Sequence, residues 1–274
     1  MRTKTSSWLA AGLMMAALLI SPAFAGTMAM GGTGGVTEPL RVIGQRFSAL
    51  SGGGVVDVVP GLGSGGAISA AADGVLQVAV SGRPLTAVEA ARGLTVTSVV
   101  CTPYVLATSR PEPASLDRGA IAALYAQTAP RWADGQPVRI VLRPRGESDN
   151  DVLFRSFPGV EQAVQQARQR DSVPVAATDQ ENADMAEQIP GSLVGTTYAQ
   201  MITERRSLRM MAINGVPPDL DAYQSNRYPI GKPLYIIIKR DQAPEVTRFL
   251  DFLRSADGLA VMRQVGLVPC PADH

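Results

Sequence analysis

Short apolar runs rich in β-branched residues alternate with amphipathic helical patterns along most of the chain. Runs of strand length lie at 55–59, 75–80, 104–108, 138–143, 173–178, 208–213 and 234–239. Helical spacing recurs between them, for example at Leu40 and Ile43, and again at Val246 and Phe249. Strands that alternate with helices are typical of α/β proteins with mostly parallel sheets. The sequence therefore predicts an α/β fold.

The first 25 residues have the three parts of a secretory signal peptide. Arg2 and Lys4 precede an apolar stretch from Trp8 to Ile20, and the small residues AFA end at Ala25. A membrane anchor is the alternative, but the apolar run of about 13 residues is shorter than the roughly 20 that a spanning helix needs. We therefore expect residues 1–25 to be removed and the protein to be periplasmic.

Charge and histidine content exclude several classes of function. Loss of Arg2 and Lys4 would lower the 25 basic residues to 23, against 24 acidic residues. A nucleic-acid binder normally has a basic excess. The one histidine, His274, is the last residue, so a Ser-His-Asp or Cys-His arrangement has no base and a zinc site has too few ligands. We expect no nucleic-acid partner, no metal and no cofactor.

Cys101 and Cys270 are the two cysteines of the chain. In an oxidising compartment two such cysteines more often pair than stay free. We therefore predict a Cys101–Cys270 disulfide, with two buried free thiols as the alternative.

The chain is long enough for two lobes. The 249 residues after Ala25 exceed what one hydrophobic core usually organises. Turn-rich segments at 108–119 and 214–233 adjoin two strand-like runs and indicate two crossings between the lobes. The expected division is 26–108 with 232–274 for lobe 1, and 109–231 for lobe 2.

Three glycine-rich or polar turns precede helical patterns. They read GGTGGVTEPL (31–40), GLGSGGAI (61–68) and LRPRGESDND (142–151). A helix N-terminus has unpaired N–H groups and a partial positive charge, and glycines let an anion approach it closely. The turns thus indicate anion binding. Simple N-capping by Ser64 or Asp149 is the alternative.

These turns and other segments resemble the periplasmic phosphate-binding proteins of ABC transporters, which have the type II periplasmic binding protein fold. The other segments are SGRPLTAVE (81–89), TAPRWADGQPVRIVLRP (128–144), INGVPPDLDAYQSNRYPIGKPLYIIIK (213–239) and FLDFLRSADGLAVMRQVGLVP (249–269). In that family two lobes close on a phosphate held by helix N-termini, hydroxyls and one arginine. The resemblance implies a two-lobed fold with two crossover strands and a ligand cleft between the lobes.

Carried over residue by residue, the resemblance implies a set of ligand-binding residues. They are Thr33, Gly34 and Gly35 in the first turn, Ser64 and Gly65 in the second, and Arg143 and Ser148 in the third. Arg145 is the other candidate for the arginine. Gly82 stands where many family members have Asp or Ser, so a specificity contact is missing there.

The third turn departs from the family pattern. Ser148-Asp149-Asn150 replaces the usual Ser-Gly-Thr, and Glu147 and Asp149 add negative charge at a presumed anion site. Like charges a few ångströms apart repel by several kcal/mol at an effective dielectric near 20. These acids are therefore expected either to point outward or to accept protons from the ligand.

The resemblance implies a monomeric, non-enzymatic solute-binding protein that captures phosphate or a related oxyanion for an ABC transporter permease. A sensor or accessory protein of the same fold, without a transport role, is the first alternative. A phosphatase is the second, and the missing histidine and metal ligands argue against it.

Overall fold

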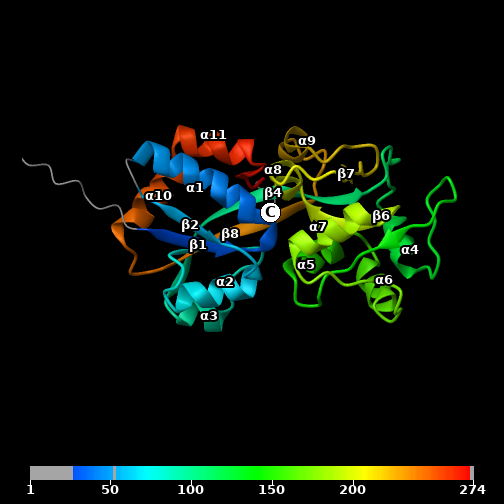
Figure 1. The fold of residues 1–274 in the computed structure, drawn as a ribbon, viewed down its shortest axis with the longest axis horizontal. Helices are drawn as coiled ribbons and strands as arrows, with labels where there is room; N and C mark the ends of the chain where they lie inside the picture. The colour runs from blue at the N-terminus through cyan, green and yellow to red at the C-terminus, as the bar shows by residue number, and fades with distance from the viewer. Residues whose placement is uncertain (1–26, 52–53, 272–274) are drawn as a thin grey trace, which may run out of the picture.

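The structure is a computed structural model that describes residues 27–51 and 54–271, so the predicted leader at 1–25 lies outside the described residues. One mixed sheet has the strand order β2-β1-β3-β8-β4-β6-β5, and β7 and β9 pair with β4. Helices cover both faces, and the molecule has two halves joined through β4 and β8 (Figure 1). The predicted α/β fold with two lobes is confirmed.

The nine strands of this sheet are β1 (Met28–Gly32), β2 (Val56–Val59), β3 (Val78–Ser81), β4 (Leu94–Thr108), β5 (Arg139–Ile140), β6 (Ser192–Thr197), β7 (Arg209–Met210), β8 (Gly231–Lys239) and β9 (Val268–Pro269). The α-helices of the described residues are α1 (Thr37–Ser51), α2 (Gly63–Ala72), α3 (Ala87–Ala91), α4 (Ile121–Ala126), α5 (Ser148–Ser156), α6 (Val160–Ala167), α7 (Asp179–Gln188), α8 (Tyr198–Thr203), α9 (Leu220–Gln224), α10 (Pro244–Arg254) and α11 (Ala256–Gln264). A 3₁₀ turn, η1 (Gly34–Val36), precedes α1.

The first lobe, built on β1 to β3 and most of β8, is a sheet between two helical layers. Val78 and Val80 pack on the core formed with α1, α10 and α11, whereas Ala79 packs on the opposite core formed with α2. In β8, Ile236 likewise packs on the core formed with α1, α10 and α11, and Ile237 packs on the core formed with α2. Successive side chains of a strand point to opposite faces, so a strand buried on both faces is apolar throughout.

Strand β4 contributes to the cores of both lobes. Val100 belongs to the core of the first lobe, while Tyr104 and Leu106 pack with α4, α5 and α6 of the second. The antiparallel pairing of β4 with β8 runs from Leu94 opposite Lys239 to Pro103 opposite Gly231. Both crossings are therefore continuous strands. The predicted division of the lobes by residue number stays a prediction.

Several local predictions were wrong. The run 173–178 forms no strand, since only a single bridge joins Val175 to Leu142. The run 138–143 shortens to the two residues of β5, and 208–213 to those of β7. Three strands, β1, β6 and β9, were not predicted at all. Pro174 lacks an N–H, so the run around it cannot donate the full ladder of hydrogen bonds.

The C-terminal segment is fixed to β4. The predicted disulfide is present, with Cα atoms of Cys101 and Cys270 4.9 Å apart. Ser255 caps α11 as its side chain accepts a 3.1 Å hydrogen bond from the N–H of Gly258. After α11 the chain turns at Gly266, whose φ of 81° suits glycine. No helix among residues 27–51 and 54–271 is long and apolar enough to span a bilayer.

Candidate functional site

Two of the predicted turns meet at one edge of the sheet in the first lobe. Strands β1 and β3 are parallel neighbours, so their carboxyl ends lie together, and the N–H of Thr33 donates to the carbonyl of Val80 at 3.0 Å. Ser64, in the first turn of α2, accepts a 2.9 Å hydrogen bond from the N–H of Gly82. Thr33 and Ser64 are buried. The first lobe thus places two hydroxyls beside the ends of its central strands.

The third predicted turn brings charge to the same place from the second lobe. Arg143 is only 6% exposed and donates to the carbonyl of Ala176 at 2.7 Å. Arg145 is exposed and hydrogen-bonds Gln165. Pro144 separates the two arginines at the end of the β5 segment, and their side chains leave it in different directions. Of the two candidates, Arg143 lies in the interior.

Asp149 points inward, which corrects one of the two expectations for the acids. Its side chain is buried and pairs with the ammonium of Lys232. Glu147 is more exposed, and its carboxylate lies 3.5 Å from Nη2 of Arg143. The capping alternative is also wrong: Glu147 occupies the N-cap position of α5, and neither Asp149 nor Ser64 caps its helix.

Lys232 is one of two residues of the site that sequence reasoning missed, and Asp179, described below, is the other. It lies near the start of β8, is 1% exposed, and also places Nζ 3.3 Å from Oγ1 of Thr33. A fully buried lysine is rare unless it is paired. The available signal was a single charge between the apolar residues of YPIGKPLYIII. That segment was matched to the family, but no role was given to its lysine.

Asp179, at the start of α7, completes a buried charged cluster. Its Oδ2 lies 3.5 Å from Nη2 of Arg143, and its carboxyl shares a hydrogen bond with that of Asp149. We call Arg143, Asp149, Asp179 and Lys232 the interlobe cluster. Two cations and two acids thus lie together in the interior, without bulk water to screen them.

The two acids of the interlobe cluster differ in protonation. Burial raises the pKa of Asp179 to about 7, and the charge of Asp149 adds to this effect. Burial opposes ionisation of Asp149 too, but the charge and hydrogen bond of Lys232 outweigh it and lower its pKa. For Lys232, burial is likewise outweighed by the two acids, so its pKa is raised. Asp149 and Lys232 are therefore the fixed ion pair, and Asp179 is the acid that keeps its proton up to about neutral pH.

Glycines let the two lobes approach each other closely at this point. A Cβ atom added to Gly82 would overlap Oγ of Ser148 and lie 2.7 Å from Cε of Lys232. One added to Gly34 would lie 3.0 Å from Cβ of Asp179. The position that resembles an Asp or Ser site in the family is thus filled by side chains from elsewhere in the chain. The junction is closed in this structure.

The predicted site residues do not all converge. Thr33, Gly34, Ser64, Arg143 and Ser148 lie at the junction through the contacts above. Gly35 lies near Thr197, toward which an added Cβ would approach to 3.1 Å of Oγ1. Gly65 is exposed. Their contact with a ligand stays a prediction.

Two buried donors at the junction lack hydrogen-bond partners. They are Nε of Arg143 and Oγ of Ser148. An unpaired buried polar group is costly, so such groups mark places where a ligand or another acceptor belongs. Both donors belong to residues that were predicted to bind an anion.

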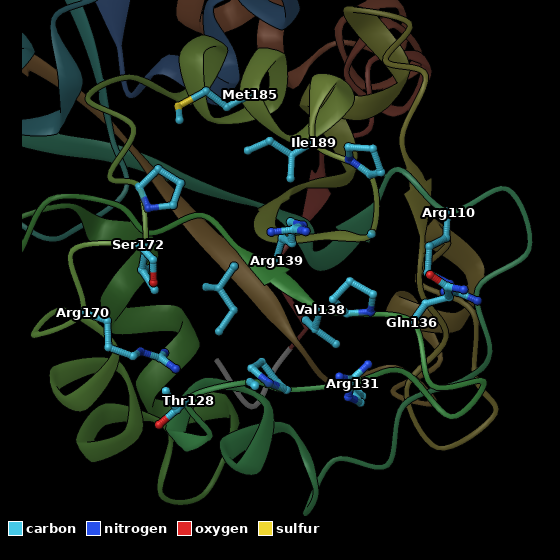
Figure 2. Close-up of a pocket in the computed structure, with 18 of the residues that line it drawn as sticks. Arg110, Thr128, Arg131, Gln136, Val138, Arg139, Arg170, Ser172, Met185 and Ile189 are labelled. Atoms are coloured by element: carbon cyan, nitrogen blue, oxygen red, sulfur yellow. The ribbon is translucent and has the colours of Figure 1, made fainter.

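A large hollow lies elsewhere, in the second lobe (Figure 2). It has a volume of about 1000 Å³ and contains none of the predicted site residues. Arg110, Arg131, Arg139 and Arg170 lie around it, as the sticks show. Arg110 pairs with Asp134 at 2.6 Å, and Arg170 donates to the carbonyl of Tyr125 at 2.7 Å. These two arginines are thus engaged in holding the surrounding loops.

The described residues contain no group of three or more His, Cys, Asp or Glu side chains that could hold a metal ion. The side chains of the interlobe cluster instead contact one another: Lys232 pairs with Asp149, and Arg143 lies within 4.0 Å of both acids. What this arrangement can do is hold a small charged group by hydrogen bonds and ion pairs.

Comparison with known proteins gives weak sequence similarity and strong structural similarity. The chain is 25% identical over 134 residues to phosphate-binding protein PstS 2 of Streptococcus agalactiae serotype V, a match that spans 48% of this chain and 45% of the relative. The chain thus matches less than half the length of that curated relative.

Among solved structures, one similar protein is a putative phosphate ABC transporter substrate-binding protein with bound phosphate from Clostridium perfringens. It has a TM-score of 0.76 and 15% identity, and the match covers 89% of this chain and 99% of that one. An ABC-type phosphate transport receptor from Vibrio cholerae has a TM-score of 0.61 and 18% identity, with 88% and 99% covered. At these identities the likeness shows the fold.

A family model covers most of the chain. The model for the PBP superfamily domain matches residues 25–257, which include every element from β1 to α10 and all four members of the interlobe cluster. Together with the two-lobed fold, this match shows that the chain belongs to the PBP superfamily.

Proposed function

We propose that this protein is an extracytoplasmic solute-binding protein that captures phosphate or a related oxyanion for an ABC transporter. The observation that supports it most is the meeting of Arg143 and Lys232 with the hydroxyls of Thr33, Ser64 and Ser148 between two lobes. Charged and neutral donors that converge in a water-poor place suit a small anion. The names of the PstS and Clostridium proteins give the same ligand class.

The transport role rests on family membership and on the leader-like residues 1–25. Export would put the protein on the outer side of the membrane, where it would act as a monomer and meet its permease. We propose no chemical step, because Arg143 and Lys232 are cations placed to bind rather than to transfer a group. Intact mass of the secreted protein should begin at Gly26. A full-length chain extracted only by detergent would contradict the proposal for export.

Isothermal calorimetry tests the ligand. Protein from which bound solutes have been removed by partial unfolding and dialysis is titrated with phosphate, sulfate, molybdate and a phosphonate. We expect at least one oxyanion to bind with a dissociation constant well below millimolar. Absence of binding by all four at millimolar concentration would overturn the proposal.

A sensor or accessory role without transport is the second candidate, and one observation favours it. The carboxylate of Asp149 already pairs with Lys232, so part of the positive charge is compensated within the chain. Failure of all four oxyanions in the calorimetric test would make this second role the better proposal.

A further inference from the structure

Lys232 joins parts of the molecule that are far apart in sequence. Its ammonium contacts Oγ1 of Thr33 in the first lobe and the carboxylate of Asp149 in the second. The three residues are buried. An ammonium has three N–H donors, and here Oγ1 of Thr33 and Oδ1 of Asp149 accept hydrogen bonds from it. Lys232 therefore holds the closed junction through Asp149.

The carboxylate of Asp149 occupies the surroundings that suit an oxyanion. The ammonium of Lys232 contacts one oxygen, and the other lies 4.0 Å from Nε of Arg143. The carboxyl of Asp179 shares a hydrogen bond with it. Asp149 also lies in the first turn of α5, where the helix favours negative charge. The carboxylate of Asp149 thus lies where two cations, a hydrogen-bond donor and a helix N-terminus favour an anion.

This internal anion leaves donors unused. Oγ of Ser148 and Nε of Arg143 are buried without a hydrogen-bond acceptor. The carboxylate of Asp149 has two oxygens, and the backbone of α5 limits where they can point. A free tetrahedral oxyanion has up to four oxygens and can take any orientation. An external oxyanion could therefore satisfy more of the donors at this point than Asp149 does.

Two anions cannot both occupy this volume without strong repulsion. The lobes meet so closely that an added Cβ on Gly82 would lie 3.0 Å from Cβ of Ser148. At the few ångströms involved, the repulsion between like charges amounts to several kcal/mol at an effective dielectric near 20. A bound oxyanion and Asp149 must therefore exclude each other from Lys232.

We propose that Asp149 is an internal competitor of the ligand: its carboxylate holds Lys232 in the absence of an oxyanion, and an entering oxyanion takes Lys232 from it. This inference rests on the proposed oxyanion-binding function. In this proposal Asp149 lowers the affinity for the oxyanion, and Lys232 contacts the bound oxyanion directly.

The test compares Asp149→Asn with Asp151→Asn, using inorganic phosphate as the probe. Both substitutions remove one negative charge from the first turn of α5, but Asp151 is exposed and has no contact with Lys232. We expect Asp149→Asn to bind phosphate at least about 10-fold more tightly than wild type, and Asp151→Asn to stay within about 3-fold. Thermal unfolding checks that both variants fold.

A second measurement needs no variant. The chain has three lysines, Lys4, Lys232 and Lys239, so protein labelled at lysine Nζ gives few NMR signals. On saturation with phosphate the signal of the buried Lys232 should shift, whereas half-buried Lys239 serves as the internal reference. An unchanged Lys232 signal in a wild-type protein that binds phosphate would overturn the inference, even where Asp149→Asn does not fold.

The outcomes separate this inference from the proposed function. Binding by wild type with no gain in Asp149→Asn overturns the competition and leaves the function standing. Binding by Asp149→Asn alone supports the competition and overturns phosphate capture by the natural chain. Absence of phosphate binding by both overturns the competition for phosphate, and the proposed function falls with it only where sulfate, molybdate and the phosphonate also fail to bind.

Discussion

The two lobes contribute to the junction in opposite ways. The first lobe offers neutral groups, namely the hydroxyls of Thr33 and Ser64 and the glycine backbone at Gly34 and Gly82. The second lobe offers ionisable groups: Arg143 with the acids around it. Lys232, on a strand shared by both, faces the charged side. The comparison teaches that the first lobe sets how closely the lobes approach, and the second sets the charge of what can lie between them.

The largest effect should come from the charged side. Arg143→Ala removes the guanidinium that faces Glu147, Asp149 and Asp179. Breaking a buried pair on one side typically costs about 3–5 kcal/mol of folding free energy. We also expect phosphate affinity to fall at least about 30-fold, since charge-assisted hydrogen bonds are the strong ones.

Arg145→Ala is the matched control for this prediction. It removes the same charge two residues away, on the surface. Chemical denaturation and calorimetry should both leave it close to wild type. Equal losses for the two variants would contradict the assignment of the charged side to Arg143.

Removal of the disulfide should change the stability of the first lobe without changing its contribution to ligand binding. Cys101 and Cys270 are 169 positions apart, so a chain-entropy model gives about 5 kcal/mol of stabilisation from the bond, and measured values are often smaller. The double variant Cys101→Ser/Cys270→Ser should lose a large part of that free energy of unfolding. Its phosphate affinity should stay within about 3-fold, because neither cysteine contacts the interlobe cluster.

Thiol titration checks the premise for the disulfide. Denatured, unreduced wild-type protein should show no free thiol from Cys101 or Cys270. Two titratable thiols would show that the bond does not form in the purified protein.

Protonation of Asp179 should make stability depend on pH. Its pKa is raised from 3.8 to about 7, so between these values the unfolded chain releases a proton that the folded chain keeps. Stability is therefore lost as pH rises from about 4 to 7. Asp149 acts in the opposite sense, because its lowered pKa stabilises above about pH 4 and the effect is lost below it.

Asp179→Asn removes the first of these effects. Relative to wild type, its free energy of unfolding should increase by at least about 1 kcal/mol between pH 4 and pH 8, with denaturation curves measured at each pH. The change across pH is the quantity that counts, since Asn also alters the hydrogen bond to Asp149 at every pH. A constant difference between the two proteins would contradict the raised pKa.

The smallest effect should come from the neutral side. Ser64→Ala removes one uncharged hydroxyl, whose loss costs about 1 kcal/mol, or roughly 5-fold in phosphate affinity. Ser69→Ala is the control, because Ser69 lies on the exposed face of the same helix. Calorimetry that finds a larger loss for Ser64→Ala than for Arg143→Ala would reverse the comparison between the lobes.

Much of the fold could be predicted from local pattern. Amphipathic spacing predicted α1 and α10. The pair of cysteines predicted the disulfide. These features depend on periodicity or on residue type alone. Strand β1, by contrast, reads MAMGG and has no β-branched residue, yet it lies between β2 and β3 and pairs with both.

The charges of the site were decided by tertiary structure. The sequence determined that two arginines and three acids lie in one turn, but it could not determine that Asp149 points inward. Its partner Lys232 is 83 positions away, and only the pairing of β8 with β4 brings that lysine to the junction. A buried carboxylate stays ionised when nearby cations outweigh the cost of burial, as at Asp149, and holds its proton when burial and a neighbouring negative charge prevail, as at Asp179. That choice depends on distances between distant segments, which local sequence does not encode.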